Sequence, residues 1–330
     1  MIISRTPLRI SFVGGGSDLP AFSTHEPGAV VSTTINRYIY ITVNPKFDRR
    51  IRASYSQTET VDRVEELQHE LIREALTVAG IDSAIEITSI SDIPSQGTGL
   101  GSSSSYTVGL LKALYAYRNQ HVGAERIARD ACEIEIGRCG KPIGKQDQYI
   151  AAYGGLQYVQ FNPDGSVFVD PIVCSPGTRQ RLESDLLLLY TGMTRSANPI
   201  LAEHKRNLSS VTHREALQHL VRLAASFRDA LTANDLSGVG DILHEGWIVK
   251  KMMAQESTNR QIDHWYECAR ANGARGGKIT GAGGGGFLLL YAPAEDHPRI
   301  CRALPELRPV PFRLEPQGTK IIYVEEADLD

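Results

Sequence analysis

The 330-residue sequence is short of the features that mark several large classes of protein. It has only five cysteines, and no two of them have the Cys-x-x-Cys spacing, which argues against a disulfide framework and a zinc site. The net charge is only −3, so the composition gives no reason to expect a nucleic-acid partner or a polybasic membrane anchor. The longest apolar runs, such as 186–190 and 287–291, have the length of a strand and are too short to span a bilayer.

The N-terminus, Met-Ile-Ile-Ser-Arg-Thr-Pro, lacks the long apolar region of a signal peptide. Together with the cysteine pattern, this predicts a cytoplasmic protein. A composition of 42% hydrophobic and 22% charged residues is that of an ordinary globular chain, and its length suggests about two domains. The sequence turns polar around 170–184, so we expect domains at 1–175 and 176–330.

Local patterns predict a mixture of strands and helices. Strands are expected at 2–5, 8–12, 30–34, 38–43, 84–90, 156–161, 166–169, 186–190, 288–291 and 321–324. Helices are expected at 62–79, 106–117, 124–136, 198–233, 235–253 and 259–272.

One stretch, 94–105, is dense in glycine and serine and reads Pro-Ser-Gln-Gly-Thr-Gly-Leu-Gly-Ser-Ser-Ser-Ser. It joins the strand at 84–90 directly to the helix at 106–117. Glycine allows positive φ and close approach to a ligand, and serine supplies N-caps and hydroxyl groups. The free N–H groups and the positive dipole end at a helix start bind phosphate. We therefore expect a phosphate-binding loop rather than a flexible linker.

Two familiar phosphate-binding motifs are absent from this stretch. A Walker loop needs a lysine after its last glycine, and there is none here. The dinucleotide fingerprint would need a third glycine where Ser104 stands. The loop therefore argues against a P-loop nucleotidase and against a nicotinamide dehydrogenase.

A second glycine-rich turn follows the strand at 8–12. Apolar and polar residues alternate in that strand, so Arg9 lies on the face opposite the apolar side chains. Three glycines, 14–16, then place Ser17 and Asp18 on a tight loop. A surface arginine and a helix-capping aspartate are the ordinary interpretations, but their position beside a glycine-rich turn favours functional roles.

Two acidic residues stand out in the middle of the chain. Glu135 lies near the end of the helix at 124–136, and Asp147 lies between two glutamines in the stretch 137–148, which we expect to be a loop because of its glycine, proline and charge. A solvated helix acid and a surface turn aspartate are the ordinary alternatives. Further on, four adjacent glycines at 283–286 precede a strand, which implies close backbone approach to a ligand or another segment.

Three glycine-bearing segments in this order, at 5–18, 94–105 and 278–287, with Asp147 between the second and third, resemble the GHMP small-molecule kinases. That family includes galactokinases, homoserine kinases, mevalonate kinases and phosphomevalonate kinases. The resemblance covers essentially the whole chain and implies an α+β fold with a mixed-sheet N-terminal domain, a ferredoxin-like α/β C-terminal domain and an active site between them. It also implies ATP and Mg²⁺ as cofactors.

The resemblance assigns roles residue by residue. The ATP phosphates would be bound by Gly97, Gly99, Leu100, Gly101, Ser102, Ser103, Ser104 and Ser105. Ser103 and Glu135 would ligate Mg²⁺, and Asp147, faced by Arg9, would be the catalytic pair. The substrate would be contacted by Gly14, Gly15, Gly16, Ser17, Asp18, Gly283 and Gly284. Candidate cations for a phosphate on the substrate are Lys145, Arg195, Lys250 and Lys278, of which we favour Arg195 and Lys145.

Within the family, residues 6–20, 144–149 and 247–251 look like the bacterial heptose-phosphate kinases. These phosphorylate D-glycero-D-manno-heptose 7-phosphate at the anomeric hydroxyl, for nucleotide-heptose synthesis feeding lipopolysaccharide, capsule or surface-layer glycans. Galactokinases carry Glu-His where this chain has Gly15 and Gly16, and the missing carboxylate leaves room for a phosphate at the far end of the substrate.

Two alternatives stay open. The first is a kinase of an unphosphorylated sugar, like a fucokinase or galactokinase, because fucokinases share similar segments. The second is a non-catalytic sugar-binding relative. In each case the expected partners are small molecules, with no nucleic acid and no membrane, and the sequence leaves room for a homodimer.

Overall fold

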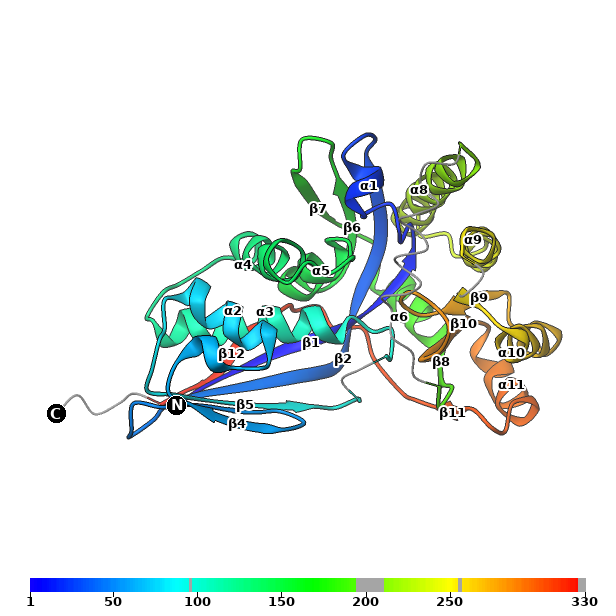
Figure 1. The fold of residues 1–330 in the computed structure, drawn as a ribbon. Helices are drawn as coiled ribbons and strands as arrows, with labels where there is room; N and C mark the ends of the chain where they lie inside the picture. The colour runs from blue at the N-terminus through cyan, green and yellow to red at the C-terminus, as the bar shows by residue number, and fades with distance from the viewer. Residues whose placement is uncertain (95–96, 194–210, 255–256, 326–330) are drawn as a thin grey trace.

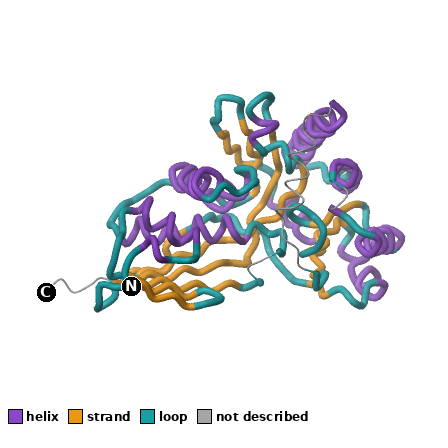
Figure 2. The backbone as a smooth tube through the Cα atoms, in the orientation of Figure 1, coloured by secondary structure: helices purple, strands orange, loops and turns teal. Residues whose placement is uncertain are grey.

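The computed structural model describes residues 1–94, 97–193, 211–254 and 257–325. They form two sheets with helices packed on them (Figures 1 and 2). The mixed-sheet, two-domain α+β architecture expected from the sequence is confirmed. Within the described ranges no helix has the length and apolarity needed to cross a membrane.

The N-terminal sheet is built around two long antiparallel strands, β1 (Ile2–Val13) and β2 (Gly28–Pro45). Its strand order is β12-β1-β2-β5-β3-β4, with β6 on β2 and β7 on β6. The other strands are β3 (Ile51–Ser54), β4 (Thr58–Val61), β5 (Ile85–Ser91), β6 (Leu156–Phe161), β7 (Val167–Pro171) and β12 (Lys320–Val324). β3 pairs with β5 in parallel and the other pairs are antiparallel, so the sheet is mixed.

The separate strands predicted at 30–34 and 38–43 are one strand in the structure, β2. The register with β1 shifts between Pro7, which faces Tyr38, and Leu8, which faces Ile35. Two residues of β2 are accommodated there as a bulge, which lets the strand continue through a polar interruption.

Helices cover one face of this sheet (Figure 2). They are α2 (Glu70–Ala79), α3 (Ser102–Tyr117), α4 (Ala124–Cys132), its π-helical continuation η2 (Glu133–Arg138) and α5 (Gln146–Tyr153), with the short α1 (Pro20–Ser23) and η1 (Val64–Glu66) elsewhere. The helix predicted at 62–79 begins only at Glu70, because the side chain of His69 caps it by accepting from the N–H of Ile72. The loop predicted at 137–148 is also too long, since α5 already begins at Gln146.

The C-terminal sheet has the order β11-β8-β10-β9, the order of a ferredoxin-like domain. Its strands are β8 (Leu186–Tyr190), β9 (Gly276–Ile279), β10 (Phe287–Tyr291) and β11 (Arg308–Pro309). The helices of this half are α6 (Pro176–Asp185), α8 (Val211–Thr232), α9 (Val239–Met253), α10 (Arg260–Ala271), η4 (Ala294–Asp296) and α11 (His297–Ala303). Only the part of the helix predicted at 198–233 that starts at 211 lies within the described residues.

The chain returns to the N-terminal sheet at its end, because β12 pairs antiparallel with β1. α8 and α9 also contact β1, and α9 contacts β9 of the other sheet. The two halves are therefore joined at β1, and the boundary between 175 and 176 stays a prediction.

Candidate active site

The centre of the site is an ion pair between β1 and α5. Nε and Nη2 of Arg9 donate to Oδ1 and Oδ2 of Asp147, both at 2.7 Å. The Arg9 side chain is 5% exposed and that of Asp147 is 23% exposed, so the arginine is enclosed while the carboxylate keeps access to solvent. Asp147 lies in the first turn of α5 and not in a loop, which corrects the prediction. A helix turn holds the carboxylate more firmly than a loop would.

Arg9 also connects this pair to the glycine-serine loop. Its Nη1 donates to the carbonyl oxygen of Gly99 at 2.6 Å, and its backbone N–H donates to the carbonyl of Leu100. The Arg9 side chain thus connects Asp147 to the glycine-serine loop, the two features that the sequence predicted to lie near it.

The loop itself ends at the start of α3. Gly97, Gly99 and Gly101 all have positive φ, between 69° and 74°. Gly101 is the N-cap residue of α3, and no side chain caps the helix. Ser102–Ser105 form the first helical turn, so the prediction that serines supply the N-cap is wrong. The consequence strengthens the site, because N–H groups of this turn are left for an anion to bind.

Two predicted metal ligands are adjacent. Oγ of Ser103 donates to Oε1 of Glu135 at 2.8 Å, and the Glu135 side chain is fully buried. The ammonium group of Lys141 lies 3.2 Å from Oγ of Ser103 and 3.5 Å from that same Oε1. A cation therefore already lies beside both oxygens, which are the hard donors that Mg²⁺ prefers. In the described ranges there is no cluster of three or more acidic, histidine or cysteine ligands, and Mg²⁺ bound through one carboxylate and phosphate oxygens needs none.

Asp18 bonds to Gln146, the residue that precedes Asp147 in α5. It is buried, and its carboxylate accepts from the backbone N–H and the side-chain amide of Gln146, at 3.2 and 3.3 Å, and from the N–H of Gly16. Burial, and then the negative charge of Asp147, raise the pKa of Asp18. Gln146 also accepts from the hydroxyl of Ser11 at 2.9 Å, so it links β1, the glycine turn and α5.

The glycine turn divides into structural and accessible residues. A β-carbon at Gly14 would lie 2.0 Å from the carbonyl oxygen of Ala29, so only glycine fits there. The Ser17 hydroxyl donates to the carbonyl of Gly14 and accepts from the N–H of Ala29. Both residues therefore anchor the turn to β2. Gly15 differs, since a β-carbon there would meet nothing closer than 3.6 Å.

The remaining predicted substrate residues do not join this cluster. The ammonium group of Lys145 donates to the carbonyl of Gly165, in the turn between β6 and β7. Gly284 donates to the carbonyl of Ser257, and the space around Gly283 is filled by the Ser257 backbone. Arg195 lies outside the described residues.

The third glycine segment contacts the phosphate-binding loop instead. A β-carbon at Gly281 would lie 2.5 Å from Cα of Gly99, and one at Gly286 would lie 2.4 Å from the carbonyl oxygen of Thr98. The hydroxyl of Thr280 donates to that same carbonyl. The glycines between β9 and β10 thus allow the backbone of the C-terminal domain to contact the phosphate-binding loop directly.

Sequence reasoning missed three residues of the site. They are Gln146, which bonds to Asp18; Gln148, which donates to Oε2 of Glu135 at 2.6 Å; and Lys141. The signal for the glutamines was their place on either side of Asp147. In α5 these side chains point in different directions, so one reaches Asp18 and the other reaches Glu135.

The fold and this geometry, an uncapped helix start beside a carboxylate held by an arginine, fit a kinase for small molecules. Residues 63–155 match the family model of the GHMP kinases N terminal domain, and residues 227–309 match that of the GHMP kinases C terminal. The chain belongs to the GHMP kinases, and the family implies ATP as the phosphoryl donor.

Individual relatives are similar over most of this chain. A D-glycero-alpha-D-manno-heptose 7-phosphate kinase of Campylobacter jejuni is 30% identical over 318 residues, 92% of this chain and 93% of its own. The bifunctional fucokinase/GDP-fucose pyrophosphorylase of Arabidopsis thaliana is 29% identical over 87% of this chain, which spans 29% of that longer protein. Among solved structures, a D-glycero-D-manno-heptose 1-phosphate kinase of Bacteroides thetaiotaomicron superposes with a TM-score of 0.82, at 26% identity, over 99% of this chain and 100% of its own.

Proposed function

We propose that this kinase transfers the γ-phosphoryl group of ATP to the anomeric hydroxyl of D-glycero-D-manno-heptose 7-phosphate, giving the 1,7-bisphosphate. The observation that carries the proposal is the two-bonded Arg9–Asp147 pair, which lies between the phosphate-binding loop and the Asp18–Gln146 cluster. The similarity to the Campylobacter kinase over nearly the full chain supports the choice of acceptor. We further infer that the product feeds nucleotide-activated heptose synthesis for surface glycans, in the cytoplasm.

In this proposal the phosphates of ATP lie against the N–H groups of the loop 97–105 and the first turn of α3. The anomeric oxygen of the acceptor lies beside Asp147, which accepts its proton. That oxygen forms a bond to the γ-phosphorus, the bond from phosphorus to the bridging oxygen breaks, and ADP leaves. Phosphoryl transfer depends mainly on positioning and charge stabilisation, and Arg9 provides both by fixing the two oxygens of Asp147 and placing a positive charge beside the transfer.

Ser103 and Glu135 would hold Mg²⁺ at the place where Lys141 now contributes a positive charge. When bound there, the ion supplies neutralisation of the charge on the ATP phosphates. Gln148 keeps Glu135 oriented by occupying its other oxygen. Asp18, whose pKa is raised, would bind hydroxyl groups of the sugar, and Gln146 fixes its direction.

The test is ADP release with a panel of acceptors: D-glycero-D-manno-heptose 7-phosphate, the same heptose without phosphate, L-fucose, D-mannose and D-galactose. The proposal predicts the highest kcat/KM for the heptose 7-phosphate. A preference for an unphosphorylated sugar would contradict it.

The second candidate is a fucokinase-like enzyme, and the similarity to the Arabidopsis protein favours it over other sugars. In that case L-fucose would be the preferred acceptor. ATP binding without ADP release for any acceptor would instead indicate a non-catalytic relative.

A further inference from the structure

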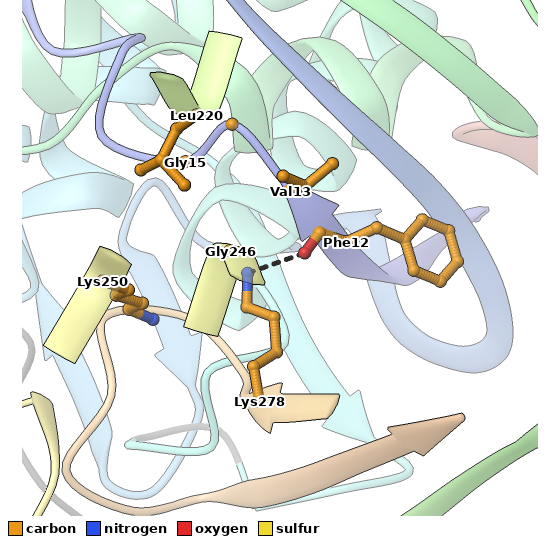
Figure 3. Close-up of a pocket in the computed structure, with 8 residues that line it drawn as sticks. Phe12, Val13, Gly15, Leu220, Gly246, Lys250 and Lys278 are labelled. Atoms are coloured by element: carbon orange, nitrogen blue, oxygen red, sulfur yellow. Dashed lines mark hydrogen bonds between the residues drawn. The ribbon is translucent and has the colours of Figure 1, made fainter. Parts of the chain in front are cut away.

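A pocket lies where β1, the glycine turn, α8, α9 and β9 meet (Figure 3). Its walls are mainly apolar or glycine, and two charged residues reach into it: Lys250 from α9 and Lys278 from β9. Gly14 and Gly15 of the turn form part of its lining.

Among the described residues, no carboxylate pairs with either lysine. The ammonium group of Lys278, whose residue is 7% exposed, donates to the carbonyl of Phe12 at 3.1 Å. Lys250 donates to the carbonyls of Gly281 and, at 3.5 Å, Ile279. Within the described parts of the chain the charges that act on them are those of other cations, Arg9 among them. An ammonium group has three donors, and Lys278 uses one of them on the residues that the structure describes.

Burying two positive charges together is costly unless an anion completes the site. Burial lowers the pKa of Lys278 to about 7 and that of Lys250 well below its usual range. Arg9 adds to both shifts, and Lys278 adds to that of Lys250. A protein anion is absent from the described surroundings, so a ligand is the natural source of the negative charge.

The pocket also adjoins the acceptor side of the active site. Gly15 lines it, and a β-carbon at Gly15 would lie 3.6 Å from the side-chain amide of Gln146, which donates to Asp18. Gly15 therefore lies between the Asp18–Gln146 cluster, which is suited to sugar hydroxyls, and the pocket that holds the two lysines.

We propose that Lys250 and Lys278 bind the phosphate that the acceptor already carries, and so set the preference for a phosphorylated over an unphosphorylated sugar. This rests on the proposed function and replaces Lys145 as the favoured cation. Two other roles are outcomes of the test: the lysines hold the two sheets together only, or they bind the γ-phosphate of ATP.

The experiment compares Lys250→Met and Lys278→Met with the control Lys112→Met. Lys112 is likewise partly buried and donates to a backbone carbonyl, that of Val122, but lies on α3 outside the pocket. Charge-assisted hydrogen bonds predict a roughly ten- to hundredfold rise in KM for heptose 7-phosphate in each pocket variant. The KM for ATP stays within about threefold of the wild-type value, as do both constants in the control.

A second variant, Gly15→Glu, tests the pocket without removing a buried lysine. A β-carbon at Gly15 would make only ordinary contacts, at 3.6 Å to the Gln146 amide and 3.9 Å to the Ser11 hydroxyl, so a side chain is accepted there. Its carboxylate would add a negative charge at the lining of the pocket and repel the phosphate. We expect a rise in KM for heptose 7-phosphate of at least about tenfold, with a smaller effect on the heptose without phosphate.

The outcomes separate the two proposals. If the wild type prefers an unphosphorylated sugar, the proposed function fails. If the wild type prefers heptose 7-phosphate but the three pocket variants keep that preference, only the assignment of the lysines is overturned. A rise in KM for ATP instead of the sugar phosphate places the lysines at the γ-phosphate, and a loss of thermal stability with unchanged KM values leaves them a structural role; both results reject the assignment.

Discussion

Both oxygens of Asp147 accept a hydrogen bond from one guanidinium group, and that group also bonds to the carbonyl of Gly99. The carboxylate is thereby fixed relative to the phosphate-binding loop before any ligand arrives. Such prior positioning is what phosphoryl transfer chiefly requires of an enzyme.

Replacing Asp147 with asparagine should remove the proton acceptor while keeping the shape of α5. We expect kcat to fall by roughly 10²–10⁴-fold, with the dissociation constant of ATP nearly unchanged because the loop is intact. Steady-state turnover and nucleotide titration measure the two effects. The matched control is Asp164→Asn, in the exposed turn between β6 and β7, which should behave as wild type; a comparable rate in Asp147→Asn would remove Asp147 from the mechanism.

The lowered pKa of Lys278, about 7, gives the lysine pocket a pH dependence. Burial lowers this pKa most, and the positive charge of Arg9 from β1 adds to the shift. Lys250, the other charged residue of the pocket, has its own pKa lowered by burial and by Lys278 and Arg9. Below pH 7 Lys278 keeps its proton and attracts the phosphate of the acceptor. As the pH rises above 7 the proton is lost, so KM for heptose 7-phosphate should rise, by at most about tenfold per pH unit for one proton.

The variant Lys278→Arg provides the control, because a guanidinium group stays charged throughout this range. Its KM for the sugar phosphate should be flat between pH 7 and 9, as measured by initial rates. The same slope in both proteins would show that another group titrates.

At the scale of single residues, the sequence predicted Arg9, Asp18, Ser103, Glu135 and Asp147 as one site, and the structure brings them together. The resemblance to the GHMP kinases supplied these roles position by position. The residues alone favoured function for Arg9 and Asp18, beside the glycine turn, and left an ordinary surface role open for Glu135 and Asp147. Burial of a lysine has no such signal. Lys278 is enclosed because β9 lies against the end of β1, 266 positions earlier in the chain, and no local pattern contains that packing.

Among the elements, the π-helical turn η2 and the third glycine segment do most to shape the site. Helical spacing predicted a helix through 136, but η2 continues it to Arg138 with a wider turn, and Glu135 lies within it, facing Ser103. π-helical turns are rare and frequently occur at functional sites. Over only six residues, the spacing of apolar side chains does not distinguish a π-helix from an α-helix, so this feature could not be predicted.

Gly281→Ala should test the contact between the glycine segment and the loop. Gly281 has a φ of 64°, and a β-carbon there would lie 2.5 Å from Cα of Gly99. The control Gly80→Ala has a φ of 65° with nothing within 4 Å of the β-carbon, so it carries only the backbone penalty of roughly 1–2 kcal/mol. We expect Gly281→Ala to be destabilised by about 1–3 kcal/mol more than the control and to raise KM for ATP.

Chemical unfolding and ATP kinetics on both variants provide the measurement. Equal losses of stability in the two, with KM for ATP unchanged in Gly281→Ala, would show that the close approach of the two segments has no functional effect.

For the molecule as a whole, the two halves meet at β1, which belongs to the N-terminal sheet and is contacted by α8 and α9 of the other half. This strand carries Arg9, leads into the glycine turn and pairs with β12 from the end of the chain. The strand at 321–324 was predicted, but its partner was not, because strand pairing across more than 300 positions depends on the complete topology. The separate domains predicted from composition are therefore tied together at the strand that positions the catalytic pair.

Deleting residues 320–330 should remove β12 and expose the edge of β1. Four residue pairs are lost, so we expect the free energy of unfolding to fall by roughly 2–4 kcal/mol, together with a loss of kcat as β1 loosens. Deleting only 326–330 leaves β12 whole and serves as the control. Wild-type stability in the longer deletion would show that β1 does not need this partner.

The most direct measurement of the central claim is a crystal structure of the enzyme with Mg²⁺, a non-hydrolysable ATP analogue and D-glycero-D-manno-heptose 7-phosphate. The account predicts the nucleotide phosphates against the loop 97–105, the anomeric oxygen within hydrogen-bond distance of Asp147, and the 7-phosphate between Lys250 and Lys278. Nucleotide phosphates bound away from that loop, or an anomeric oxygen out of reach of Asp147, would contradict it.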